Sequence, residues 1–264
     1  MAFLFEETDG LWVMMNLERF KIAKESEIRR LREQPPPLPL AVSRPRFLSP
    51  RAKEERIRVI AEYKRASPSR GVISERFSPE EIAELYTHGG ACAISVLTEE
   101  VFFRGELDFL WRVASGTGLP LLRKDFIFEE VQVRATAATP ASALLLIVGL
   151  TPDVGRLRGL RVLAESLGLT AVVEVFDEGE LDVARAAGAR VIQVNNRNLE
   201  TLEVDVGVTR RLVARRAEGE LWVAASGFES RVQLDGLAGY DAALVGSALM
   251  GSGDPCEALR GLTR

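Results

Sequence analysis

The sequence contains few of the residues that build disulfide, metal or nucleophile sites. Among its 264 residues are two cysteines, Cys92 and Cys256, and one histidine, His88. Two cysteines are too few for a disulfide framework, and this pair lacks metal-ligand spacing. His88 lies in "YTHGGA" at a predicted helix end, where a cation complements the helix dipole. We therefore expect structural roles for all three residues, and no metal site.

An excess of positive charge is also absent. The 34 basic and 38 acidic residues give a net charge of −4, so composition provides no electrostatic attraction for nucleic acid or an anionic membrane. The most apolar run, "ALLLIVGL" at 143–150, is far shorter than the roughly 18 residues of a membrane-spanning helix. No secretory leader is apparent, which predicts a reducing, cytoplasmic setting. We expect a small-molecule ligand, with no nucleic acid or membrane partner.

Lysine is much rarer than arginine in this chain. The chain has 29 arginines but only five lysines, and two of these, Lys64 and Lys124, lie at predicted strand ends next to an arginine. A desolvated ammonium can lose its proton, whereas a guanidinium in practice cannot, so proton transfer could require lysine at these places. We predict functional roles for Lys64 and Lys124. Lys21, Lys24 and Lys53 fit solvated charges without a function.

From about residue 58, short apolar runs alternate with amphipathic segments of ten or more residues. Such alternation indicates parallel strands joined by helical crossovers, and eight units predict a (β/α)8 barrel, the TIM barrel. The alternative is an open doubly wound sheet, although no G-x-G-x-x-G follows the first strand, which weakens its dinucleotide-binding version. The predicted strands are 58–64, 92–97, 119–124, 143–148, 170–176, 190–195, 221–226 and 242–247.

The first part of the chain predicts a separate extension. Residues 1–34 are charged and helix-prone, but "PPPLPL" at 35–40 cannot continue a helix because proline lacks the amide hydrogen and clashes with the preceding turn. We expect a partly helical N-terminal extension over residues 1–50 that packs on a barrel domain over residues 51–264.

Polar side chains interrupt the apolar runs near the carboxyl ends of most predicted strands. In a barrel the chemistry collects at these ends and in the loops that follow them. Glu62 and Glu174 stand out because an unpaired charge inside an apolar run is costly, although any single charge at a strand end could simply reach water. The polar residues in question are Glu62, Lys64, Lys124, Glu174, Asn195, Arg197 and Ser226.

The last two strands are followed by "ASGFES" and "GSALMGSGDP". Glycines there let main-chain amides approach a ligand, and in many barrels the loops after strands seven and eight hold a phosphate. Ser226, Gly227, Gly246 and Ser247 are therefore candidates for a phosphate site. Ordinary turn chemistry is the alternative, since Gly-Ser pairs are common in loops.

Several motifs together carry a family resemblance. "IAEYKRASPSRGVI", "AISVLTEE" followed by "FFRGELDFL", "PLLRKDFI", "LLLIV", "VVEVF", "VNNRNLETLEVD", "ASGFES" and "LVGSALM" resemble, in order and spacing, the motifs of indole-3-glycerol phosphate synthase over about residues 45–255. The resemblance implies a barrel with an N-terminal helical extension and an activity in tryptophan biosynthesis. The implied reaction converts 1-(2-carboxyphenylamino)-1-deoxyribulose 5-phosphate into indole-3-glycerol phosphate, with loss of carbon dioxide and water and without metal or organic cofactor.

The resemblance also implies roles for residues of this chain. Lys124 resembles the general acid that protonates the ribulose carbonyl, and Glu174 the acid–base group of dehydration. Lys64, paired with Glu62, would hold the substrate carboxylate or share in proton transfer. The remaining implied contacts are Asn195 and Arg197 for the anthranilate part and hydroxyls, Ser67 in a mobile loop, Phe103 and Phe126 in the pocket, Ser226 as a polar contact, and Gly227, Gly246 and Ser247 for phosphate.

One position departs from the family pattern, and two rival functions remain. Ala225 stands where the family often has glutamate, which puts support of the lysine or asparagine network in doubt.

Phosphoribosylanthranilate isomerase, a related barrel, would need a cysteine and an aspartate where this chain has Glu62 and Lys64. A non-catalytic phosphate binder or assembly subunit would be indicated by loss of Lys124 or Glu174, and both are present. Other enzymes of the tryptophan pathway are the candidate protein partners.

Overall fold

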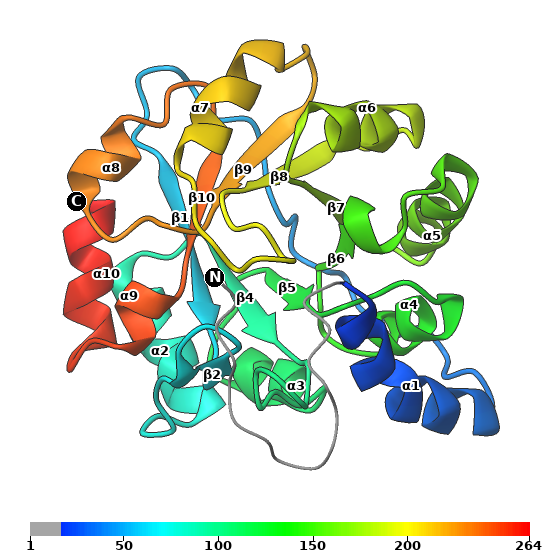
Figure 1. The fold of residues 1–264 in the computed structure, drawn as a ribbon. Helices are drawn as coiled ribbons and strands as arrows, with labels where there is room; N and C mark the ends of the chain where they lie inside the picture. Colours follow the sequence, from blue (N-terminus) through cyan, green and yellow to red (C-terminus); the bar gives the residue numbers. More distant parts are fainter. Residues whose placement is uncertain (1–16) are drawn as a thin grey trace.

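A computed structural model of the protein describes residues 17–264. Eight parallel strands form a closed barrel in the order β1-β10-β9-β8-β7-β6-β5-β4, with helices around it (Figure 1). Closure confirms the predicted TIM barrel and excludes the open sheet. The barrel strands are β1 (Arg58–Tyr63), β4 (Ala93–Leu97), β5 (Leu121–Lys124), β6 (Ala143–Ile147), β7 (Thr170–Val175), β8 (Val191–Asn195), β9 (Leu221–Ala225) and β10 (Ala242–Val245).

The helices follow the strands and cover the barrel. The start of α2 is closed by a capping box, in which the Ser78 hydroxyl accepts from the Glu81 amide and the Glu81 side chain accepts from the Ser78 amide. Gly90 ends the same helix in the left-handed conformation, at φ 88°. The helices are α2 (Pro79–Gly89), α3 (Phe109–Ser115), α4 (Glu130–Ala137), α5 (Val154–Ser166), α6 (Glu178–Ala186), α7 (Gly207–Leu212), α8 (Arg231–Asp235), α9 (Ser247–Met250) and α10 (Pro255–Thr263), with 3-10 turns η1 (Val148–Leu150) and η2 (Val213–Arg215).

Alternate residues along each strand belong to two different cores. In β1, Val59 and Ala61 pack in the layer between strands and helices, whereas Ile60 belongs to the cluster inside the barrel. The period of two therefore turns Glu62 inward as well, because it follows Ile60 by two positions. In β5 the same alternation turns Lys124 inward and Arg123 outward toward the helices. Strand alternation thus decides which charged residues reach the mouth of the barrel.

The chain before the barrel forms one described helix, α1 (Glu18–Glu33), which packs beside α4 (Figure 1). The proline-rich segment at 35–40 is not helical, as predicted. The part of the expected extension at residues 1–16 lies outside the described residues, and the division of the chain at residue 50 stays a prediction. Within residues 17–264, no helix combines the length and the apolar character needed to cross a membrane.

Candidate functional site

A cavity of about 300 Å³ opens at the carboxyl ends of the strands. Four basic side chains and two acidic ones line it, so the cavity as a whole favours an anionic ligand. Of the predicted site residues, Glu174 and Gly246 do not line this cavity, and the others do: Glu62, Lys64, Ser67, Phe103, Lys124, Phe126, Asn195, Arg197, Ser226, Gly227 and Ser247.

Glu62 at the end of β1 joins the two predicted lysines. Its Oε1 lies 2.8 Å from the Lys64 Nζ, and its Oε2 lies 3.8 Å from the Lys124 Nζ. Burial alone would raise the pKa of Glu62, but the positive charges of Lys64 and Lys124 outweigh it and hold the pKa below its ordinary value. Glu62 is therefore a buried anion that keeps both ammonium groups at the floor of the cavity.

Glu174 faces a smaller cavity that adjoins the first and shares Phe103, Lys124 and Phe126 with it. The Glu174 carboxylate accepts a hydrogen bond from Asn195 Nδ2 at 3.0 Å and another from the Gln193 side-chain amide. Both donors come from β8, whose register sets Gln193 opposite Glu174. Neighbouring strands thus fix the carboxylate on the Lys124 side of the site.

Three aromatic rings form one wall of the cavity. Phe103 and Phe126, both predicted, lie with ring centroids 6.1 Å apart. Phe20 of α1 stacks on Phe126 at 4.1 Å with the ring planes 22° apart, and it also lines the cavity. Such a wall suits a flat aromatic ligand, because offset stacked rings attract one another and bury apolar area.

Two loops bring further polar groups to the rim. Ser67 lies in a short antiparallel pair formed by β2 (Ala66–Ser67) and β3 (Gly71–Val72), directly after the first barrel strand. Arg197 follows β8, where its backbone amide donates to Asn195 Oδ1 at 3.0 Å. Burial is the main cause that lowers the pKa of Arg197, with the charge of Arg70 acting in the same direction. Arg70 also lines the cavity and was not predicted.

The predicted phosphate residues lie in two loops that meet at the cavity. Ser226 and Gly227 after β9 both have positive φ, at 69° and 85°. This conformation is uncommon for serine, and such outliers persist where the surroundings determine them, often at ligand sites. Asn196 Nδ2 donates to the Ser226 carbonyl at 3.0 Å and helps to hold the turn. Ser247 lines the same cavity from the start of α9.

Gly246, a predicted phosphate residue, also has a steric requirement that was not predicted. It lies outside the cavity lining, but a Cβ atom at this position would collide with the Glu62 carboxylate. The absence of a side chain at Gly246 thus leaves room for Glu62, and its contact with phosphate stays a prediction. Ala225, which pairs with Asn195 in the sheet, is buried and lines the cavity, so a methyl group faces the cavity at this position.

The other sequence predictions have mixed outcomes. His88 lies in the last turn of α2, where its Nδ1 is 2.9 Å from the Glu84 carbonyl, and Cys256 is buried in the first turn of α10. The prediction that Lys24 is a solvated charge is wrong, because its side chain is 1% exposed and paired with Asp125. The reason is tertiary: α1 sets this face against the barrel. Among residues 17–264, no cluster of three His, Cys, Asp or Glu side chains could hold a metal ion.

Comparison with known sequences gives a consistent family. The family model for indole-3-glycerol phosphate synthase matches residues 17–262. Indole-3-glycerol phosphate synthase of Chloroherpeton thalassium is 44% identical over 238 residues, covering 89% of this chain and 88% of the relative. The protein of that name from Desulfotalea psychrophila is 40% identical over 256 residues, covering 94% and 98%.

Comparison with solved structures supports the fold alone. A 3-hexulose-6-phosphate synthase has a TM-score of 0.64 at 15% identity, covering 78% of this chain and 98% of that chain. A thiamine phosphate pyrophosphorylase from Pyrococcus furiosus has a TM-score of 0.58 at 18% identity, covering 78% and 93%. On the evidence of the sequence matches over nearly its whole described length, the chain belongs to the indole-3-glycerol phosphate synthase family.

Proposed function

We propose that the chain is an indole-3-glycerol phosphate synthase of tryptophan biosynthesis, a carboxy-lyase that works in the cytoplasm. It closes the indole ring of 1-(2-carboxyphenylamino)-1-deoxyribulose 5-phosphate and releases carbon dioxide and water. Family membership supports the activity. The structural observation that carries the proposal is the convergence of Lys64 and Lys124 on the Glu62 carboxylate inside one cavity.

The substrate has an anion at each end, and the cavity has features suited to both. Lys64 binds the carboxylate on the aromatic ring of the substrate or shares in proton transfer. The phosphate fits the loops of Gly227 and Ser247, where backbone amides and a helix start favour an anion. The aromatic ring fits against Phe103 and Phe126, and Asn195 and Arg197 orient the ring and the hydroxyl groups.

Ring closure requires the ring carbon that bears the carboxylate to attack the ribulose carbonyl. Lys124 donates a proton to the carbonyl oxygen as the new carbon–carbon bond forms. The ring carbon then loses carbon dioxide, and the electron pair of the broken bond restores the ring. One positioned general acid contributes typically about 10²- to 10⁴-fold in rate, so Lys124 acts together with the orientation of the two ends.

Dehydration then removes the hydroxyl group that the first step created. Glu174 acts as the acid–base group, taking a proton from the substrate and assisting loss of water. Its hydrogen bonds from Asn195 and Gln193 hold the carboxylate beside Lys124. Lys124 on β5 and Glu174 on β7 both line the smaller cavity, and two such groups suit a reaction with two successive proton-transfer steps.

The test is a direct assay. Purified protein is mixed with the carboxyphenylamino deoxyribulose phosphate, and indole formation is followed by absorbance while carbon dioxide release is measured in parallel. We expect both products in a one-to-one ratio. Tight binding of the substrate without either product would identify a non-catalytic binder and overturn the proposal.

A further inference from the structure

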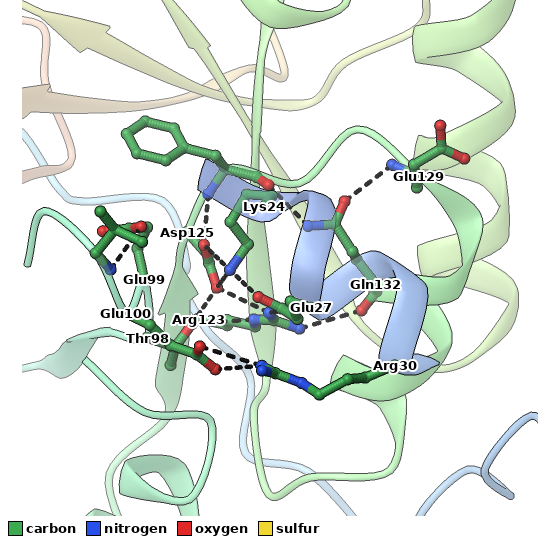
Figure 2. Close-up of polar contacts among 12 residues, drawn as sticks. Lys24, Glu27, Arg30, Thr98, Glu99, Glu100, Arg123, Asp125, Glu129 and Gln132 are labelled. Atoms are coloured by element: carbon green, nitrogen blue, oxygen red, sulfur yellow. Dashed lines mark hydrogen bonds and ion pairs between the residues drawn. The ribbon is translucent and has the colours of Figure 1, made fainter. Parts of the chain in front are cut away.

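A buried ionic cluster fastens α1 to the barrel next to the cavity (Figure 2). It consists of Lys24 and Glu27 of α1 with Arg123 and Asp125 at the end of β5, and we call it the α1 ionic cluster. Lys24 Nζ lies 2.9 Å from Asp125 Oδ1 and also pairs with Glu27. Arg123 Nη2 lies 2.9 Å from Glu27 and 2.8 Å from Asp125. The cluster thus holds two positive and two negative charges.

Because the cluster is buried, its stability depends on the balance of positive and negative charges. The side chains of Lys24 and Arg123 are each 1% exposed, and that of Asp125 is fully buried. Burial by itself would raise the pKa of Asp125, yet Lys24 and Arg123 hold that pKa well below its ordinary value. Removing one partner of a buried pair leaves an uncompensated charge, which is far more costly than losing an exposed pair.

Arg123 is held independently of α1. Its Nε donates to Thr98 Oγ1 at 3.1 Å, and its Nη1 donates to the Gln132 carbonyl at 3.2 Å and to Thr136 Oγ1 at 3.0 Å. These partners belong to the barrel and to α4. If Lys24 lost its charge, Arg123 would therefore stay in place, and Glu27 and Asp125 would repel each other around it.

Asp125 connects the cluster to the cavity. It directly follows Lys124 in the chain, and its Oδ1, the atom 2.9 Å from Lys24, also accepts the backbone amide of Phe126 at 2.8 Å. Lys124 and Phe126 both line the cavity. One carboxylate thus lies between two cavity residues and takes its position from a cation on α1.

We propose that the α1 ionic cluster is a positioning device for the reaction, in which Lys24 acts through Asp125 to set where Lys124 and Phe126 stand in the cavity. The inference rests on the proposed function, because Lys124 is the acid of that reaction. Lys24 lines neither cavity and Asp125 lines only the smaller one, so we assign both as positioning residues that act through Lys124 and Phe126. Phe20, one helical turn before Lys24, stacks on Phe126 and is brought to the cavity by the same docking of α1.

The first variant is Lys24→Met, which keeps the length of the side chain and removes the charge. We expect kcat to fall about tenfold or more while KM changes less than about threefold, because a misplaced acid affects the transition state more than substrate binding. Rates are measured at a temperature where circular dichroism shows the variant fully folded. Lys21→Met, at a half-buried position of the same helix that lies outside the cluster and the cavities, is the matched control and should keep wild-type kcat.

A double variant that restores the charge balance distinguishes a positioning role of the cluster from a role that only attaches α1 to the barrel. Lys24→Met with Glu27→Gln removes one charge of each sign, so the cluster is neutral again, and we expect kcat to recover to within about threefold of wild type. If Lys24→Met does not fold, Asp125→Asn, which preserves the side-chain shape, is expected to show the same selective loss of kcat.

Each outcome decides between the hypotheses. Wild-type kcat in folded Lys24→Met, or in Asp125→Asn, would overturn the positioning role. The cluster would then only attach α1 to the barrel. A loss of kcat that Glu27→Gln fails to recover would overturn the charge mechanism. Wild-type protein that forms no indole would instead refute the proposed function, so the two failures are distinguishable.

Discussion

At the scale of single residues, Glu62 sets the charge of the cavity floor. It is 3% exposed, and its two carboxylate oxygens face different lysines. The backbone of Gly246 passes so close that no side chain could be added there without displacing the carboxylate. An anion fixed in this way holds the two ammonium groups near each other, although they would otherwise repel.

Lys124 is the residue whose loss should affect turnover most. We expect Lys124→Met to lower kcat by about 10²- to 10⁴-fold, because it removes the proposed proton donor. Substrate affinity, measured by calorimetry, should stay within about tenfold, since the other three basic side chains of the cavity remain. Lys53→Met, at an exposed position outside the cavity, is the control. Unchanged turnover of Lys124→Met would remove its assignment as the acid.

Glu180 on α6 gives a prediction about pH. Burial, as the largest cause, raises its pKa from 4.5 to about 7. The folded state therefore holds the proton more tightly than the unfolded state, and this group lowers stability as pH rises from about 4.5 to about 7. Between pH 5 and pH 8, we expect the unfolding free energy of wild type to fall by about 1–2 kcal/mol relative to that of Glu180→Gln.

The Glu180 measurement is a pair of denaturant titrations at the two pH values. Glu180 accepts the Phe176 amide at 2.7 Å, and glutamine can keep that bond through its carbonyl oxygen. Glu178→Gln removes an exposed carboxylate from the same helix and should leave the pH dependence of stability as in wild type. An equal pH dependence in Glu180→Gln and wild type would contradict the assignment.

At the scale of elements, the barrel depends on how each helix begins and docks. The capping box of α2 satisfies two backbone donors that the helix itself cannot pair. The far end of α2 packs on α10, where a Cβ at Gly89 would come within 2.8 Å of Leu259. The helix is thus fixed at both ends, and α3 lies between it and α1 around the barrel (Figure 1).

We expect Ser78→Ala to lower the unfolding free energy by about 1 kcal/mol and to leave kcat unchanged, because α2 covers the barrel outside the cavity. Thermal unfolding measures the loss. Ser166→Ala, which removes an exposed hydroxyl near the end of α5, should change stability by less than about 0.5 kcal/mol. A cost at position 78 no larger than that at 166 would mean that the cap contributes little.

The elements were predictable from the sequence to different degrees. All eight strands lie within two residues of their predicted bounds, because strands covered on both faces are written as nearly continuous apolar runs. The same runs placed Glu62 and Lys124 near the carboxyl ends of their strands. We also expected the extension to pack on the barrel, but not which face of α1 docks there, since a sequence pattern does not show what covers a helix face. Hence Phe20 was missed and Lys24 was misjudged. Arg70 was missed for another reason, because it lies in the turn between β2 and β3 and not at the end of a barrel strand.

At the scale of the whole molecule, the site is assembled from segments that are distant in the chain. The cavity takes residues from α1, from the first strand, and from the loop after the last strand. The cluster at Lys24 and the pair at Glu62 form two ionic groups on either side of β5, one outside the barrel and one inside it. Arg123 and Asp125 belong to the group outside the barrel, and Lys124 between them belongs to the group inside it.

Closure of the barrel has a consequence for how the protein is made. Val59 of β1 pairs with Ala243 of β10, so the two strands that complete the ring are separated by almost the whole barrel sequence. During synthesis on a ribosome, β1 emerges long before its neighbour exists, and its unpaired edge is a template for aggregation until then. A nascent chain that has not yet released residues 242–245 therefore lacks both a closed barrel and a complete anion site.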